Sequence, residues 1–155
     1  MRICFVIFFS LLSYSLSAQV KLLTLDQLDA RIARGKDTTY VINFWATWCS
    51  PCVAEIPYFE RLKTAKIKKP VKVLLVSLDF KSKLQKEVIP FVKGNNIKSE
   101  VFLLNESDQQ AYIERIDKNW TGAIPATLFV IKDLRRFYEK QFTEAELANT
   151  LLGLK

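Results

Sequence analysis

A chain of 155 residues is long enough for one domain with one hydrophobic core and too short for two ordinary domains. Half of its residues are hydrophobic and a quarter are charged, which excludes a disordered or collagen-like chain. The net charge is +7, but the lysines are scattered apart from one modest cluster, which we interpret as a solvated helix end and not as a nucleic-acid site. That cluster is Lys63, Lys66, Lys68 and Lys69.

The first 18 residues differ from the rest of the chain. Arg2 gives a positive start, residues 3–12 are apolar apart from Ser10, and small residues follow up to Ala18. This pattern is typical of a secretory signal peptide, and the apolar run is shorter than the roughly 20 residues of a membrane-spanning helix. We therefore expect a signal peptide over residues 1–18 and one exported domain over residues 19–155. An uncleaved N-terminal anchor is the alternative.

Helical and strand patterns alternate through the rest of the chain. In chain order, the sequence predicts a helix over residues 24–34, a strand over 40–46, a helix over 50–66, a strand over 71–78, a helix over 82–94, a strand over 101–104, a helix over 107–116, strands over 126–131 and 135–141, and a last helix after Thr143. Thr24 with Gln27, and Thr143 with Glu146, fit capping boxes. The pattern predicts an α/β domain with a mainly parallel sheet covered on both faces and a terminal hairpin that makes it mixed.

Two cysteines remain once the expected signal peptide, with Cys4, is removed. Cys49 and Cys52 are separated by two residues, so a bond between them closes almost no loop and constrains the unfolded chain little. Redox chemistry explains the pair better than a structural disulfide, which remains an alternative. Zinc needs four ligands, and the mature chain has no further cysteine and no histidine. We therefore expect no metal site and no cofactor.

The two cysteines lie where a buried strand passes into a helix. The free N–H groups at a helix N-terminus favour an anion, which lowers the pKa of a thiol placed there. Cys52 lies one turn later and should be the more buried of the two. This difference predicts that Cys49 attacks a partner's disulfide, and that Cys52 then resolves the mixed disulfide.

Two motifs resemble those of thioredoxin-like proteins. The first is Trp48-Cys49-Ser50-Pro51-Cys52 after a strand that reads Val41-Ile42-Asn43-Phe44-Trp45, and the second is Ala123-Ile124-Pro125-Ala126-Thr127 before a late strand. The closer resemblance is to the exported TlpA/ResA branch of thiol–disulfide oxidoreductases. It implies a thioredoxin fold, with a central mixed β-sheet flanked by helices and a βα insertion typical of that branch.

The resemblance also implies roles for individual residues. Typical thioredoxins carry a buried aspartate where this chain has Asn43, whereas the TlpA/ResA pattern has a glutamate three residues after the second cysteine, which here is Glu55. Cys52 and Glu55 are spaced i, i+3 on one side of a helix, so a partly buried carboxylate there can accept the proton of Cys52. The alternative is that Glu55 only follows the preference for acidic residues early in a helix.

The second motif resembles the cis-proline loop of the fold. The resemblance implies a cis bond before Pro125, with the backbone of Ile124 offered to an extended substrate beside Trp48, Ser50 and Pro51; a proline that only starts the next strand is the alternative. We expect Trp120 to rim the same site. Core packing is the role expected for Trp45.

The direction of electron flow follows from the residues between the cysteines. Ser50 and Pro51 offer no histidine to stabilise a thiolate at Cys49, and Pro51 lacks a backbone donor, so we expect a comparatively reducing protein. The resemblance implies a periplasmic reductase of exported proteins, including those of cytochrome c maturation, with a membrane electron donor. The alternatives are a disulfide oxidase or isomerase, a redox-inert binding module and, more weakly, a metallochaperone.

Overall fold

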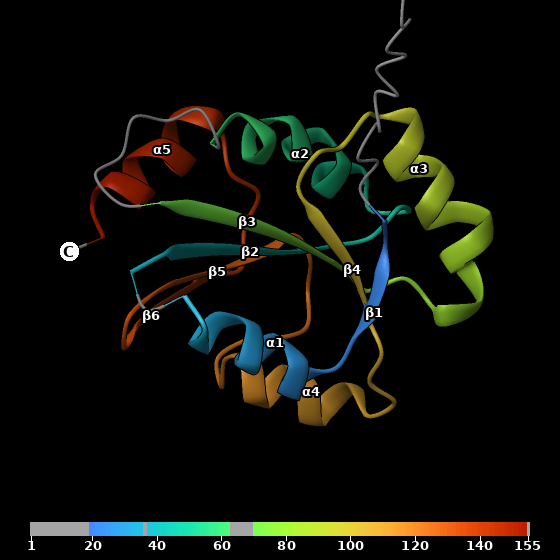
Figure 1. Ribbon diagram of the computed structural model, residues 1–155, viewed down its shortest axis with the longest axis horizontal. Coiled ribbons are helices and arrows are strands. Elements are labelled where there is room, and N and C mark those ends of the chain that lie inside the picture. Colours follow the sequence, from blue (N-terminus) through green and yellow to red (C-terminus); the bar gives the residue numbers. More distant parts are fainter. Residues whose placement is uncertain (1–18, 36, 63–69, 155) are drawn as a thin grey trace, which may run out of the picture.

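The computed structural model describes residues 19–35, 37–62 and 70–154 of the chain (Figure 1). The expected signal peptide over residues 1–18 and the lysine cluster between residues 63 and 69 lie outside the described residues. Within the described part, no helix is long and apolar enough to cross a membrane.

A six-stranded sheet forms the centre of the domain. Its strands are β1 (Lys21–Leu23), β2 (Thr39–Trp45), β3 (Val71–Ser77), β4 (Glu100–Leu104), β5 (Ala126–Ile131) and β6 (Leu134–Tyr138). They lie in the order β1-β4-β3-β2-β5-β6. The first four in this order pair in parallel, whereas β5 and β6 run antiparallel to their neighbours, so the predicted mixed sheet with a terminal hairpin is confirmed.

Helices cover both faces of this sheet. They are α1 (Leu25–Ala33), α2 (Ser50–Leu62), α3 (Ile89–Gly94), α4 (Gln109–Ile116) and α5 (Glu144–Leu152). Figure 1 shows α2 and α5 on one side of the sheet and α1 and α4 on the other. The core residues agree, because α2, α3 and α5 share one buried cluster and α1 and α4 share a second. Alternate residues of the fully buried β2 supply both clusters, as a central parallel strand requires.

Both predicted capping boxes are present. The hydroxyl of Thr24 accepts from the backbone N–H of Gln27 and the side chain of Gln27 accepts from the backbone of Thr24, and Thr143 with Glu146 repeats the arrangement at α5. Each box supplies partners to N–H groups that the first turn of a helix leaves unpaired. These residues therefore fix where α1 and α5 begin.

The segment predicted as one helix over residues 82–94 is less regular. It starts as a 3₁₀ turn, η1 (Lys81–Lys83), continues as a π turn, η2 (Leu84–Val88), and becomes α-helical only at α3. Pro90 has no N–H to complete the α-helical pattern with the preceding turn, and a wider turn accommodates that gap. The helix predicted from Ser107 begins instead at Gln109, because the carboxylate of Asp108 caps it by accepting from Ala111 N.

The strand β1 was not predicted from the sequence. It has three residues and pairs with β4 at the edge of the sheet, so its apolar pattern is too short to distinguish from the start of α1. Its last residue, Leu23, is buried beside Leu25 and Leu28 of α1. The strand thereby anchors the beginning of the domain to the sheet.

Candidate active site

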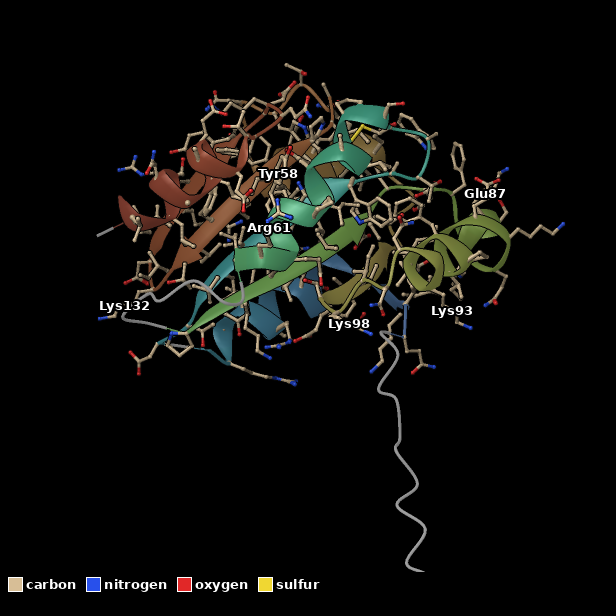
Figure 2. The ribbon with its side chains drawn as sticks, turned by 90° about the horizontal axis from the view of Figure 1, so that it is seen from above. Tyr58, Arg61, Glu87, Lys93, Lys98 and Lys132 are labelled. Atoms are coloured by element: carbon tan, nitrogen blue, oxygen red, sulfur yellow. A yellow bond between two sulfur atoms is a disulfide. The ribbon has the colours of Figure 1, made fainter. Side chains whose placement is uncertain are left out.

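A disulfide joins Cys49 and Cys52 at the start of α2. The S–S distance is 2.00 Å and the two Cα atoms lie 5.3 Å apart; Figure 2 shows the bond in yellow beside α2. Cys49 immediately precedes the helix and Cys52 lies in its first turn, where the backbone N–H of Cys52 points to Cys49 Sγ at 3.4 Å. Cys49 keeps 6% of its surface exposed and Cys52 none. The helix start thus faces the more accessible sulfur, an arrangement that favours a thiolate at Cys49.

The loop before β5 lies against this disulfide. The Ile124–Pro125 peptide bond is cis, as the resemblance implies, and Ile124 O lies 3.8 Å from Cys49 Sγ. The fold therefore brings together two motifs separated by 75 residues in the chain. Ser50 and Pro51 are exposed at the start of α2. Trp48 is 67% exposed just before the disulfide.

Glu55 is fully buried on α2, one turn after Cys52. Its Oε1 accepts a hydrogen bond of 2.8 Å from Asn43 Nδ2, and its Oε2 accepts one of 2.7 Å from the backbone N–H of Phe142. Burial disfavours the charged carboxylate and raises its pKa from 4.5 to about 7, although both hydrogen bonds act in the opposite direction. A group with such a pKa exchanges its proton near neutral pH, as a general base must.

Asn43 connects this carboxylate to the sheet. Its Nδ2 also donates to Thr127 Oγ1 at 3.2 Å, and all three side chains are completely buried. Its Oδ1 is buried without a hydrogen-bond partner among the described residues. The amide cannot itself take up a proton in the physiological range, so Glu55 is the titratable group of this network.

Sequence reasoning missed Asp79, a second buried carboxylate, which is 4% exposed and bonded to Thr47 before the cysteine motif. It follows the end of β3 and accepts hydrogen bonds from Thr47 N at 3.0 Å, Thr47 Oγ1 at 2.6 Å and Ser77 Oγ at 2.7 Å. These bonds hold the turn that leads from β2 into the cysteine motif. The available signal was an acidic residue directly after a buried parallel strand, where ligands and catalytic loops gather.

Trp120 differs from its expected place. Its side chain is only 4% exposed and packs against Phe44 with ring centroids 5.2 Å apart. Its Nε1 donates to Ala123 O at 2.8 Å. Trp120 therefore supports the cis-proline loop from the core and does not rim the site, because an indole can bury its ring while its N–H reaches a backbone acceptor. The expected core position of Trp45 is confirmed, with no exposed surface.

The described residues offer little to a metal ion. No group of three or more histidine, cysteine, aspartate or glutamate side chains within residues 19–35, 37–62 and 70–154 is arranged to hold one. The chemistry that the site does support is that of a dithiol beside a buried carboxylate.

The fold and the paired motifs define a thioredoxin-like protein. A solved structure with this fold, a thiol:disulfide interchange protein from Chlorobium tepidum, superposes with a TM-score of 0.63 at 20% identity over 77% of this chain and 81% of that one. The Redoxin family model matches residues 17–146, so the chain belongs to the Redoxin family.

Sequence relatives support the narrower resemblance to the TlpA/ResA branch. The thiol-disulfide oxidoreductase ResA of Oceanobacillus iheyensis is 41% identical over 54 residues, which are 35% of this chain and 28% of that protein. The sporulation thiol-disulfide oxidoreductase A of Bacillus subtilis is 32% identical over 63 residues, which are 41% of this chain and 38% of that protein. The chain thus spans well under half of the length of these two curated relatives.

Proposed function

We propose that this chain is an exported thiol–disulfide oxidoreductase that reduces disulfides in extracytoplasmic partner proteins. The observation that carries the proposal is the Cys49–Cys52 disulfide at the start of α2, placed against the Ile124–Pro125 loop and one turn from Glu55. The names of the ResA and sporulation relatives support the same activity. Export rests on the N-terminal sequence pattern, and the periplasm is the compartment that we propose.

The reaction begins with the reduced pair. The Cys49 thiolate attacks one sulfur of the partner's disulfide, that S–S bond breaks, and the partner's other sulfur leaves and takes up a proton. Cys52 then gives its proton to Glu55 and attacks Cys49 Sγ. The mixed disulfide breaks, the Cys49–Cys52 bond forms, and the second partner sulfur is protonated. Two electrons have passed to the partner, so a thiol donor, which we propose to be a membrane protein, must reduce the pair again.

Glu55 suits the second step because its pKa of about 7 lies near the operating pH. Below that pH the buried carboxylic acid is protonated and accepts nothing, and above it the carboxylate is ready to take the proton of Cys52. We propose that the partner is contacted by the neighbours of Cys49 in the chain, Trp48, Ser50 and Pro51, and by Ile124 and Pro125 of the loop whose carbonyl lies 3.8 Å from Cys49 Sγ.

The reduction potential of the Cys49–Cys52 pair tests the proposed direction. Equilibration of the protein in glutathione and dithiothreitol buffers, followed by tryptophan fluorescence, measures it, because Trp48 adjoins the pair. We expect a value near or below about −250 mV, in the range of thioredoxin. A value between about −120 and −180 mV would make an oxidase or isomerase the better assignment. A pair that resists reduction, with Cys49 slow to alkylate, would indicate a redox-inert binding module.

A further inference from the structure

A crevice of about 800 Å³ lies at the edge of the sheet where β2, β3 and β4 end. Its walls come from the segments that follow these three neighbouring parallel strands, together with the cis-proline loop. The residues that matter here are Trp48, Asp79, Phe80, Glu106, Tyr112 and Ile124. The chain leaves β3 toward the helices of one face and leaves β4 toward α4 on the other face, so the connections that follow these two paired strands diverge at this point. In open α/β sheets, ligands bind in the crevice at such a switch.

Two aromatic side chains are exposed in this crevice. Phe80 is 78% exposed and Trp48 is 67% exposed. Among the described residues, only two other large hydrophobic side chains are exposed, Leu22 and Leu152, and neither lines the crevice. Because exposed apolar surface gathered in one hollow marks a binding site more often than scattered residues do, the pair indicates an apolar partner group.

The backbone around both aromatic residues is fixed by one carboxylate. Asp79 precedes Phe80 and accepts two hydrogen bonds from Thr47, which precedes Trp48. The carbonyl of Phe80 accepts a further bond from Lys83 N at 2.8 Å. The two exposed rings therefore stand on segments that are tied to each other, and a preorganised site of this kind loses less entropy when it binds.

The crevice is continuous with the reactive disulfide. Trp48 is the residue before Cys49, and Ile124, whose carbonyl lies 3.8 Å from Cys49 Sγ, also lines the crevice. In an extended segment, residues i and i+2 point to the same side and lie about 7 Å apart. A partner segment whose cysteine reaches Cys49 thus has its second neighbour on the same side, about 7 Å further along, where the crevice lined by Trp48 and Phe80 can receive it.

We propose that this crevice selects partner proteins that carry a large apolar or aromatic side chain two residues from the reactive cysteine, with Phe80 as the specificity-determining residue. This inference rests on the proposed exchange reaction at Cys49. The volume accommodates a segment of several residues, within the usual range for ligand sites. Glu106 also lines the crevice, and its carboxylate, which accepts a hydrogen bond of 2.7 Å from Leu25 N, adds polar surface there.

The test uses three oxidants and the reduced protein. Two are extended peptides whose single cysteine is linked to glutathione, one with tryptophan and one with serine two residues away, and the third is glutathione disulfide. Stopped-flow tryptophan fluorescence gives the rate constant for each. We expect the tryptophan peptide to react about tenfold faster than the serine peptide, because burial of one aromatic side chain supplies at least that preference. In Phe80→Ala, we expect this preference to fall to within about twofold.

Leu152→Ala is the matched control, since it removes an exposed apolar side chain, 62% exposed, away from the crevice. It should keep the full preference of the native protein for the tryptophan peptide. A preference that persists in Phe80→Ala, or that is absent from the native protein, overturns the inference. Failure of the native protein to react with glutathione disulfide overturns the exchange reaction itself, which separates the two proposals.

Discussion

Two buried carboxylates adjoin the cysteine motif, Asp79 through its bonds to Thr47 and Glu55 on the helix of Cys52, and they differ in what holds them. Asp79 accepts three hydrogen bonds, two from Thr47 and one from Ser77, at 2.6–3.0 Å. Glu55 accepts one bond at each oxygen, from Asn43 and from Phe142 N. Asp79 thus fastens a turn to the end of a strand, whereas Glu55 lies in a sparser network on the cysteine helix.

The comparison shows that burial alone does not identify a proton acceptor. Both carboxylates are at most 4% exposed, yet only Glu55 shares a helix with Cys52 at a spacing of three residues. Its pKa is raised to about 7 because burial outweighs its two hydrogen bonds. The donors around each carboxylate and its position relative to Cys52 therefore set Glu55, the proton acceptor that we propose, apart from Asp79.

Replacement of Glu55 should have the largest effect on activity. In Glu55→Gln the proton of Cys52 has no acceptor, so we expect resolution of the mixed disulfide to slow by about 100- to 1,000-fold at pH 7, within the range for loss of a general base. The native rate should rise with pH through about 7, whereas the variant should lack that rise. Stopped-flow fluorescence of the reduced protein mixed with a partner disulfide, from pH 5 to pH 9, measures both.

Glu144→Gln is a suitable control for this measurement. Glu144 is an exposed carboxylate at the start of α5, with an ion pair of 2.6 Å to Arg61 of α2, which Figure 2 labels beside Tyr58. Its replacement leaves the cysteines and Asn43 untouched, so the rate should keep its native pH profile. An unchanged pH profile in Glu55→Gln would remove Glu55 from the mechanism and leave it a structural residue like Asp79.

Much of the fold was predictable because local signals agreed with the tertiary structure. The capping boxes at Thr24 and Thr143 mark helix starts that depend on neighbouring residues alone. The prediction failed for elements whose structure depends on other parts of the chain or on an irregular turn. β1 exists because β4 offers an edge, and the π turn before Pro90 reflects how one helix tolerates a missing N–H.

The residues of the candidate site also divide into those that local patterns predict and those that depend on distant contacts. Cys49, Cys52 and Glu55 lie within seven residues, so their spacing on one helix was visible in the sequence. Asp79 was missed because Thr47, which it ties to the end of β3, lies 32 residues away along the chain. Only the parallel pairing of β2 with β3 brings Thr47 to Asp79, and single-sequence patterns do not specify that register.

The pH dependence of stability gives a second way to test the contrast between Glu55 and Asp79. Below about pH 4.5 Glu55 is protonated in both the folded and the unfolded oxidised protein, and its contribution to stability is greatest. As the pH rises through about 7, the folded state must carry a buried charge, and we expect about 3 kcal/mol to be lost. Urea unfolding of the oxidised native protein and of Glu55→Gln at pH 4.5, 6 and 8 isolates this contribution, because other groups cancel in the difference. A constant difference across pH would contradict the raised pKa.

Replacement of Asp79 should lower stability and should not alter the pH profile of exchange. In Asp79→Asn one oxygen becomes an NH₂ group, so at least one of the donors from Thr47 and Ser77 loses its acceptor, and we expect a loss of about 2 kcal/mol. Thr47→Val removes one of those donors together with its need for an acceptor and should cost only about 1 kcal/mol. Urea unfolding at pH 7 and the exchange rate from pH 5 to pH 9 distinguish the roles. If Asp79→Asn abolished the rise of the rate near pH 7 while the fold remained intact, Asp79 would be part of the proton path and the two carboxylates would act together.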